Sequence, residues 1–244
     1  MTARTILITG ASSGIGRATA ELFLDAGWRV GLLARRAELL EQIAAGRDAA
    51  LVLPADVTVA QAVDAAFDRF IDWAGRIDVL FNNAGFFGPQ APIDEVAVEA
   101  WQEVLAVNVT GMFLAARAAF ARMRRQEPQG GRIINNGSLS AHNPRPGSVC
   151  YTTSKHAITG LTRSLSLDGR AFDIACGQID IGNARTPIVE SLTARAAASG
   201  QPVQPTMDVV HAARSVLHMA ELPPEANVQF TTVLATKMPY IGRG

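Results

Sequence analysis

The sequence predicts an α/β fold in which a parallel sheet is covered by helices on both faces. Seven short runs rich in Val, Ile, Leu or Thr alternate with longer amphipathic segments. Strands that are buried on both faces have such near-continuous apolar runs, and the intervening helices make the parallel connections. This doubly wound architecture binds ligands at the carboxyl ends of its strands. The seven runs cover residues 4–9, 28–34, 49–56, 77–85, 131–138, 172–180 and 228–236.

Chain length and composition favour one domain over residues 1–244. With 244 residues and 48% hydrophobic side chains, the chain suits a single large core. The segments 15–26 and 59–73 have the pattern of amphipathic helices. The EPQGG stretch at 127–131 is interpreted as a loop rather than a linker, because the strand after it belongs to the same sheet.

Charge and cysteine content narrow the classes of function. Lys plus Arg equals Asp plus Glu at 22 each, which gives no reason to expect a nucleic acid or a membrane as partner. Cys150 and Cys176 have neither a disulfide-framework nor a metal-ligand spacing, so no metal is expected. The first apolar run is too short for a signal peptide or a membrane span. We therefore expect a soluble, cytoplasmic protein.

A glycine-rich loop, TGASSGIG, follows the first run and opens the first helix. Its first glycine permits a tight turn, and the later two allow a phosphate and the strand to approach the backbone. The helix N-terminus offers free N–H groups to a pyrophosphate. The spacing differs from G-x-G-x-x-G, and a glycine turn without a ligand is the alternative. The predicted dinucleotide contacts in this loop are Gly10, Ser12, Ser13, Gly14, Ile15 and Gly16.

The end of the second run indicates which dinucleotide binds. An NAD site of this type has an acidic residue there to hold the ribose 2′-hydroxyl. This chain has Arg35 and Arg36 instead, and its next carboxylate is Glu38, which is expected inside the following helix. A guanidinium binds a 2′-phosphate through charged hydrogen bonds, to which the Ser13 hydroxyl would add one more. The pattern favours NADP(H) over NAD(H), and two merely solvated arginines are the alternative.

Four motifs in this order resemble those of the classical short-chain dehydrogenases/reductases: TGASSGIG, NNAG at 82–85, NNGS at 135–138 and YTTSK at 151–155. The resemblance covers nearly the whole chain. It implies a Rossmann-type fold of seven parallel strands, an NAD(P) cofactor and a catalytic group of Asn, Ser, Tyr and Lys. The residues that match this group are Asn108, Ser138, Tyr151 and Lys155.

The chemistry of these residues agrees with the resemblance. Positions i and i+4 share one face of a helix, so Tyr151 and Lys155 point the same way. A free tyrosine has a pKa of about 10, and a nearby ammonium, helped by an oxidised nicotinamide, favours the phenolate. Tyr151 would then exchange a proton with the substrate oxygen, and Ser138 would hydrogen-bond that oxygen. The resemblance further implies that Lys155 holds the nicotinamide ribose and that Asn108 holds a water molecule linked to Lys155. From the residue alone, a tolerated polar residue in a helix explains Asn108 equally well.

The resemblance also implies contacts with the adenosine half of the cofactor. Asp56 ends the third run and would accept a hydrogen bond from the adenine amine, while Val57 would line the ring. Asn82, Ala84 and Gly85 would form the turn under the adenosine ribose. An ordinary turn is the alternative for the NNAG motif alone.

The chain departs from the family pattern after the sixth run. The family has Pro-Gly-x-Val-x-Thr, and this chain has IGNART, in which Ile181 replaces the proline. Gly182 and Thr186 match, so the Ala184 N–H and the Thr186 hydroxyl are expected to bind the nicotinamide carboxamide. Two polar residues just before this segment either support the loop or contact the substrate: Gln178 and Asp180.

The expected substrate cleft is mostly apolar and has no arginine cluster, which favours a neutral, fairly hydrophobic carbonyl or secondary alcohol. His142 is a candidate proton carrier, although a loop histidine that is simply exposed is the alternative. The small residues, Gly and Pro within 186–205 predict a mobile lid. The candidate cleft residues are Phe86, Phe87, Leu139, Ser140, His142, Pro144, Cys150 and Val189.

These observations predict an NADP(H)-dependent oxidoreductase that transfers hydride between nicotinamide and a carbonyl or secondary alcohol. One alternative is a 3-oxoacyl-carrier reductase, which requires a basic patch such as Arg122, Arg124 and Arg125 near the cleft. Another is a cofactor-binding sensor or scaffold without turnover, although such proteins typically lack the tyrosine or the lysine. A homo-oligomer, dimer or tetramer, is expected, and the small apolar face 115–123 would suit its interface or the core.

Overall fold

All seven strands lie in one parallel sheet, in the order β3-β2-β1-β4-β5-β6-β7. The computed structural model describes residues 3–187, 189–190, 193–194, 200 and 203–241. Each apolar run of the sequence contains one strand, so the predicted doubly wound parallel fold is confirmed. The strands are β1 (Thr5–Thr9), β2 (Arg29–Ala34), β3 (Ala50–Pro54), β4 (Val79–Asn82), β5 (Gly131–Asn136), β6 (Ile174–Gly182) and β7 (Phe230–Leu234).

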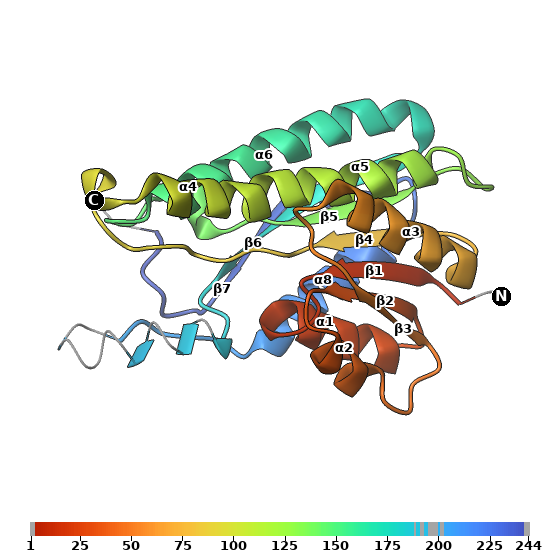
Figure 1. The fold of residues 1–244 in the computed structure, drawn as a ribbon, viewed down its shortest axis with the longest axis horizontal. Helices are drawn as coiled ribbons and strands as arrows, with labels where there is room; N and C mark the ends of the chain where they lie inside the picture. The colour runs from red at the N-terminus through yellow and green to blue at the C-terminus, as the bar shows by residue number, and fades with distance from the viewer. Residues whose placement is uncertain (1–2, 188, 191–192, 195–199, 201–202, 242–244) are drawn as a thin grey trace.

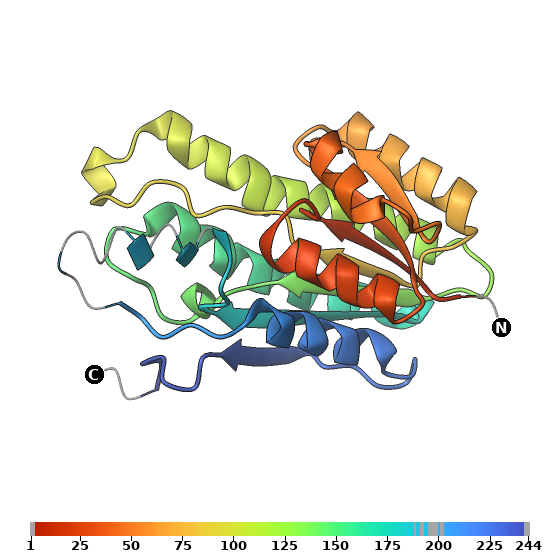
Figure 2. The ribbon, with the colours of Figure 1, turned by 90° about the horizontal axis from the view of Figure 1, so that it is seen from below.

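Helices cover both faces of the sheet (Figures 1 and 2). One face carries α1, α2 and α8, and the other carries α3, α4, α5 and α6. Each face packs against its own apolar cluster, as the buried runs require. The helices are α1 (Gly14–Asp25), α2 (Ala37–Ala44), α3 (Ala60–Ala74), α4 (Val98–Leu105), α5 (Met112–Met123), α6 (Val149–Gly169) and α8 (Val209–Glu221).

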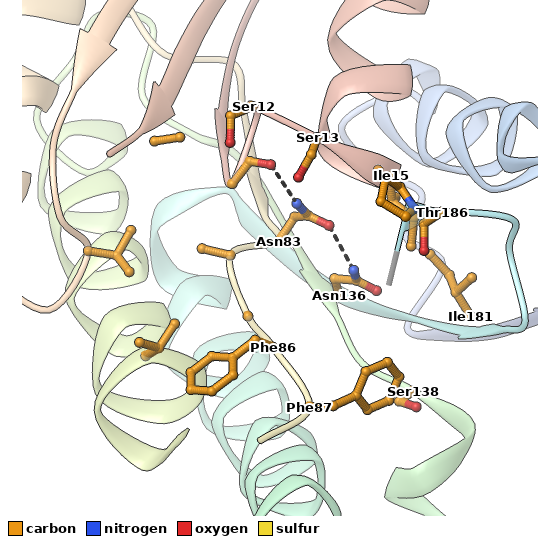
Figure 3. A pocket seen from close by; sticks show the side chains of 18 of the residues that line it. Ser12, Ser13, Ile15, Asn83, Phe86, Phe87, Asn136, Ser138, Ile181 and Thr186 are labelled. Atoms are coloured by element: carbon orange, nitrogen blue, oxygen red, sulfur yellow. Dashed lines mark hydrogen bonds between the residues drawn. The ribbon is translucent and has the colours of Figure 1, made fainter. Parts of the chain in front are cut away.

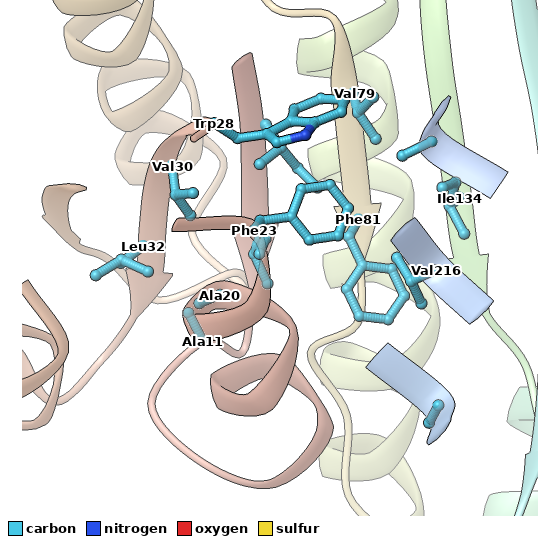
Figure 4. Close-up of a cluster of buried hydrophobic side chains, with 14 of the residues drawn as sticks. Ala11, Ala20, Phe23, Trp28, Val30, Leu32, Val79, Phe81, Ile134 and Val216 are labelled. Carbon is cyan, nitrogen blue, oxygen red and sulfur yellow. The ribbon is translucent and has the colours of Figure 1, made fainter. Parts of the chain in front are cut away.

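Aromatic side chains anchor α1 to the sheet (Figure 4). Phe23 of α1 meets Trp28 edge to face, with 4.9 Å between the ring centroids. Phe81 of β4 and Val216 of α8 belong to the same buried cluster. This packing fixes α1 against the sheet near the C-terminal end of the helix, while the glycine loop joins its N-terminal end to β1.

The order in which strands are added to the sheet reverses beside β1, which pairs with β2 on one side and with β4 on the other. A doubly wound sheet opens a crevice at such a switch point, outside the carboxyl ends of the strands. The Thr9 hydroxyl joins the two loops at this point, because it accepts hydrogen bonds from Asn83 N at 2.8 Å and Ala84 N at 3.0 Å. The fold therefore predicts the ligand site between the β1 and β4 loops.

The segment Val98–Met123 is one long helix in which residues Ala106–Gly111 form a π-helical turn. It is long and apolar enough by composition to cross a membrane, but such core helices of folded domains pass the same test. Its small residues Ala115, Ala116, Ala118 and Ala119 are buried against the sheet. The predicted interface 115–123 is therefore largely core, because small side chains let the helix approach the strands closely.

Candidate active site

A cleft of about 510 Å³ opens at the carboxyl ends of the strands (Figure 3). Its walls come from the loops after β1 to β6, as the switch point predicts. Three predicted cofactor residues lie outside its lining: Gly16, Asn82 and Gly182. The predicted residues that line it are Gly10, Ser12, Ser13, Gly14, Ile15, Arg35, Arg36, Asp56, Val57, Ala84, Gly85, Tyr151, Lys155, Ala184 and Thr186.

The glycine loop is shaped to bring backbone to the cleft. Gly10 and Gly14 have φ values of 68° and 55°, a region that side chains disfavour. A Cβ atom on Gly16 would lie 2.2 Å from the Gly10 carbonyl oxygen, so Gly16 serves close packing inside the loop rather than the cleft surface. Within the described chain, no side chain caps the N-terminus of α1. Its backbone N–H groups therefore remain available to an anion.

Two arginines stand at the adenosine end of the cleft. Arg36 donates from Nη2 to Ser12 Oγ at 3.3 Å, and both Arg35 and Arg36 are exposed. Among the described residues, neither guanidinium forms an ion pair. Asp56 accepts from Thr58 N at 2.9 Å, and this hydrogen bond, with help from the Arg35 charge, holds the carboxyl pKa below its usual value. The Asp56 carboxylate is thus an ionised acceptor within reach of the Arg35 charge.

The NNAG motif contributes a different asparagine from the one expected. Asn82 is buried in β4 and donates to Met112 O at 2.7 Å, so it joins the sheet to α5 instead of facing the cleft. Asn83 lines the cleft, donates to Thr9 O at 3.0 Å and accepts from Asn136 Nδ2 at 2.8 Å (Figure 3). The strand ends at Asn82, and only the next residue can turn outward.

One polar atom of the cleft is buried without a partner among the described residues. Asn136 Oδ1 accepts no hydrogen bond, although Asn136 lines the cleft next to Lys155. A buried acceptor without a partner is costly, which makes it a natural contact for a ligand hydroxyl. Together with the uncapped helix and the glycine cradle, it fits a dinucleotide whose ribose lies near Lys155.

Lys155 and Tyr151 lie one turn apart on α6. The Lys155 side chain is almost fully buried, donates from Nζ to Asn136 O at 2.8 Å, and has Nζ 5.5 Å from the Tyr151 ring centroid. Burial lowers the pKa of Lys155 to about 8, against the opposing charge of Asp180. At neutral pH the ammonium is therefore still the main form, but it holds its proton weakly.

Tyr151 holds its proton more firmly than the sequence suggests. Burial raises the pKa of Tyr151, while the Ser138 side chain and the Arg145 charge oppose this rise and the Asp180 charge reinforces it. The expected lowering by Lys155 is not among the main effects on the Tyr151 pKa, because desolvation of the buried phenolate outweighs them. The phenol is the resting form of Tyr151.

Asn108 sits in the π-helical turn and is fully buried. Its Oδ1 accepts from Phe86 N at 2.9 Å, and its Nδ2 donates to Phe86 O at 2.8 Å and Ser154 Oγ at 3.1 Å. Asn108 does not line the cleft. In this structure it joins the loop after β4 to α6. The signal for this structural role in the sequence is an asparagine in the middle of a predicted helix.

The substrate end of the cleft differs from the expected one. Phe86, Phe87 and Val189 line it, and the Phe87 ring packs against Tyr151 with 4.3 Å between centroids. A tight turn that begins at Ser138, whose Oγ accepts from Ser140 N at 3.1 Å, carries the next residues away from the cleft. The expected residues outside the lining are Leu139, Ser140, His142, Pro144 and Cys150.

Several cleft residues were not predicted, because the path of the loops brings them there and no motif marks them. Arg145 reaches the cleft from the loop before α6, and Glu103 reaches it from α4. The predicted lid 186–205 lies partly outside the described residues. The other residues that line the substrate end are Val107, Ile181, Asn183 and Pro187.

Loss of the family proline leaves an ordered turn after β6. Asn183 adopts a φ of 51°, which asparagine tolerates better than most residues. The turn is tied by a Met207 N to Asn183 O bond of 3.0 Å and an Arg185 N to Met207 O bond of 2.8 Å. Gln178 and Asp180 are buried and do not line the cleft, so they support the neighbouring loops and do not contact substrate.

Comparison with known proteins agrees with this site. The family model for the short chain dehydrogenases matches residues 4–197. The chain is 39% identical to a 2-(R)-hydroxypropyl-CoM dehydrogenase from Xanthobacter autotrophicus over 194 residues, 77% of each chain. It is 35% identical to a cis-4-hydroxycyclohexanecarboxylate dehydrogenase from Sinomonas cyclohexanicum over 206 residues, 83% of this chain and 82% of the relative.

A solved structure shares the whole fold. The 3-ketoacyl-(acyl-carrier-protein) reductase from Brucella melitensis, complexed with NADH, superposes with a TM-score of 0.86 at 25% identity, covering 96% of this chain and 98% of the other. The sheet, the glycine loop, the Tyr–Lys pair and these relatives lead to one conclusion: the chain belongs to the short-chain dehydrogenase/reductase family of oxidoreductases, which act on alcohols or carbonyls with NAD(P).

Proposed function

We propose that the protein is an NADP(H)-dependent carbonyl reductase or alcohol dehydrogenase in which residues 1–244 work as a single domain. The observation that carries the cofactor preference is the pair Arg35 and Arg36 at the end of β2, exposed and without an ion-pair partner in the described chain. A 2′-phosphate would satisfy both guanidinium groups, whereas NAD(H) offers them only a hydroxyl.

The nicotinamide supplies or takes up hydride when it is bound, and the protein handles the proton. In carbonyl reduction, the phenol of Tyr151 donates its proton to the substrate oxygen as hydride reaches the carbon. In alcohol oxidation, the phenolate removes the hydroxyl proton. Ser138 lies beside Tyr151 in the cleft and donates a hydrogen bond to the same oxygen. Lys155 hydrogen-bonds the nicotinamide ribose and stabilises the phenolate by its charge.

We propose a neutral, fairly apolar small molecule as substrate. Phe86, Phe87 and Val189 give the substrate end aromatic and aliphatic walls. At this end, the guanidinium of Arg145 and the carboxylate of Glu103 both line the cleft. Because a carboxylate accompanies the guanidinium there, this end does not specifically select carboxylate or phosphate substrates.

The alternative of a 3-oxoacyl-carrier reductase would need a basic patch beside the cleft, and the expected arginines do not favour one there. Arg122 lies in the last turn of α5, the end that leads into the start of β5, whereas the cleft opens at the carboxyl ends of the strands. It also bonds Asp68 Oδ1 at 2.5 Å, which neutralises its charge. The Arg122–Arg125 patch is thus at the wrong edge of the sheet to guide a carrier to the cleft.

A sensor without turnover is the second alternative. Tyr151, Lys155 and Ser138 all occupy the cleft, which favours catalysis. Tyr151→Phe separates the two functions, because it removes the transferable proton and leaves the cofactor cleft in place. If Tyr151→Phe kept the full biological effect of the protein, that result would support the sensor function and contradict the proposed catalytic function.

The proposed cofactor is tested by titrating the protein with NADPH and with NADH while following cofactor fluorescence. We expect NADPH to bind at least about tenfold more tightly, since two charged hydrogen bonds distinguish the two cofactors. Arg35→Ala should abolish most of this difference in affinity, because it weakens the binding of NADPH and leaves the binding of NADH unchanged. Arg69→Ala, which removes an exposed arginine of α3 outside the cleft, is the matched control. Equal binding of NADH and NADPH by the parent protein would refute the role of Arg35.

We also propose a homo-oligomer, a dimer or tetramer, located in the cytoplasm. Its interface would use the apolar side chains that α5 and α6 leave exposed, Phe113 and Leu167. Both described cysteines are buried free thiols, which suits a reducing compartment.

A further inference from the structure

A buried carboxylate joins the catalytic serine to the end of β6. Asp180 is 1% exposed. Its Oδ1 accepts from the backbone N–H of Ser138 at 2.8 Å and from Gln178 Nε2 at 2.8 Å. Its Oδ2 lies 2.8 Å from His142 Nε2. All three contacts reach the carboxylate from the strands and the turn that hold Ser138, and none comes from the cleft.

The backbone is built around this carboxylate. A Cβ atom on Gly137 would lie 2.0 Å from Asp180 Oδ1 and 2.6 Å from Gln178 Nε2, so only glycine leaves room for the network. Gln178 is itself held from α6, where Thr162 Oγ1 donates to Gln178 Oε1 at 3.2 Å. The carboxylate therefore has one fixed place, directly against the residue that precedes Ser138.

A buried charge in this position destabilises the folded protein. Removing a carboxylate from water carries a large free-energy penalty, which hydrogen bonds offset only in part. Within the described chain Asp180 has no Lys or Arg partner, and its titratable neighbour is His142, whose side chain is 42% exposed. The other titratable or charged groups around it are Tyr151 and Lys155 of α6, whose proton affinities its charge raises, and Arg145, whose charge acts on Tyr151.

We propose that Asp180 is a positioning residue of the active site, which fixes Ser138 through its backbone N–H and sets the charge felt by Tyr151 and Lys155. This inference rests on the proposed acid–base role of Tyr151. His142 then acts as the outer partner that orients Asp180, and not as a proton carrier to substrate, since it lies outside the cleft lining.

In this arrangement, the charge of Asp180 favours carbonyl reduction over alcohol oxidation near neutral pH. A fixed negative charge opposes the phenolate, so Tyr151 stays a proton donor, which is the form that carbonyl reduction consumes. It also keeps Lys155 as an ammonium despite burial. The same charge raises the pH at which alcohol oxidation, which needs the phenolate, becomes fast.

A direct test is available because the chain has two tyrosines, Tyr151 and Tyr240. In a Tyr240→Phe background, the near-ultraviolet absorbance of the phenolate reports Tyr151 alone, without substrate or cofactor. Asp180→Asn preserves the shape and the acceptor for Ser138 N–H but removes the charge. We expect the Tyr151 midpoint to fall by about one pH unit, the usual effect of one close charge.

Asp168→Asn is the matched control. It removes an exposed carboxylate from α6, the helix that carries Tyr151, and should leave the Tyr151 midpoint unchanged. A Tyr151 midpoint that stays in place or rises in Asp180→Asn would overturn the electrostatic part of the proposal. This titration remains decisive even if the proposed cofactor or substrate class proves wrong, so the two failures are distinguishable.

The positioning of Ser138 is tested by steady-state kinetics of carbonyl reduction. Asp180→Ala removes the acceptor and should lower kcat at least about tenfold with KM changed less than about twofold, because the misplaced group acts on the transition state. Asp180→Asn should recover most of that loss in kcat while keeping the shifted midpoint. If the alanine variant does not fold, the asparagine variant still tests the charge of Asp180 through the Tyr151 midpoint. Equal kcat values in the parent, alanine and asparagine proteins would refute the positioning of Ser138.

Discussion

Lys155 shows how a single residue exchanges stability for chemistry. Lys155 is 3% exposed and forms no ion pair with a carboxylate among the described residues, although its ammonium donates to Asn136 O at 2.8 Å. Burial lowers its pKa from 10.5 to about 8. The unfolded chain thus binds the proton more tightly than the folded protein does, and the charged form destabilises the fold.

We predict that Lys155→Met raises the free energy of unfolding by about 1–3 kcal/mol at neutral pH while abolishing catalysis, because it removes a buried charge at nearly constant shape. The penalty in the parent protein is fully present below pH 8 and disappears as pH rises from about 8 to 10.5. Denaturant unfolding of both proteins across this range measures the difference. A methionine variant that is less stable at neutral pH would show that the ammonium stabilises the fold.

Gly16 gives a second prediction at the residue scale. A Cβ atom there would lie 2.2 Å from Gly10 O, so Gly16→Ala must open the loop that presents N–H groups to the cofactor. We expect cofactor binding about tenfold weaker or more, from a strain of about 1–3 kcal/mol. Gly160→Ala is the control, because nothing lies within 4 Å of that position on α6. Cofactor titration of both variants checks the prediction, which would fail if they bound alike.

At the scale of elements, the π-helical turn between α4 and α5 supports one wall of the cleft, which its Val107 lines. It turns the Asn108 side chain toward the loop after β4, where both backbone groups of Phe86 bond to it. Gly111 lets the same turn approach the loop after β3, because a Cβ atom there would lie 2.8 Å from Val57 Cγ2. Irregular turns inside helices are often found at functional sites, and this one fixes one wall of the substrate end.

We predict that Asn108→Ala lowers the free energy of unfolding by about 1–3 kcal/mol, because it leaves the partly buried backbone groups of Phe86 without their partner. It should also raise KM for the substrate, since Phe86 lines the cleft. Thermal or denaturant unfolding and steady-state kinetics measure both effects. Asn143→Ala, at an exposed loop position, should change neither. Unchanged stability in Asn108→Ala would contradict this structural role.

For the whole molecule, the layer of α4, α5 and α6 carries large apolar side chains that the fold leaves uncovered. Phe113 of α5 is 49% exposed and Leu167 of α6 is 61% exposed. These helices lie side by side on one face in Figures 1 and 2. Because large exposed apolar side chains on one face favour association, the proposed oligomer would bury this layer.

We predict that Phe113→Lys combined with Leu167→Lys shifts the proposed oligomer to smaller species, because two buried ammonium groups would repel across the interface. Light scattering after size-exclusion chromatography measures the mass. Val203→Lys, at an exposed apolar position away from these helices, is the control. An unchanged mass in the double variant would place the interface elsewhere, and a monomeric parent protein would refute the oligomer.

The sequence by itself determined the sheet, the order of its motifs and the cluster at the cleft, because these depend on local patterns. Apolar runs mark strands, glycines mark backbone that approaches closely, and four-residue spacing aligns Tyr151 with Lys155. Each of these signals lies within a few residues of sequence, so the local structure that it specifies depends little on the rest of the fold. The departure at Ile181 was also visible, because it breaks a motif.

Only the tertiary structure decided which side chains share space across distant loops. In the structure Asn83 lines the cleft in place of the predicted Asn82, and the predicted Leu139, Ser140 and His142 lie outside its lining. Arg145, which was not predicted, lines it. The tertiary structure also joined Asp180 to Ser138, 42 positions away in the sequence. The physical reason is that a strand end or a tight turn sets the direction of each side chain, and one residue of difference reverses it.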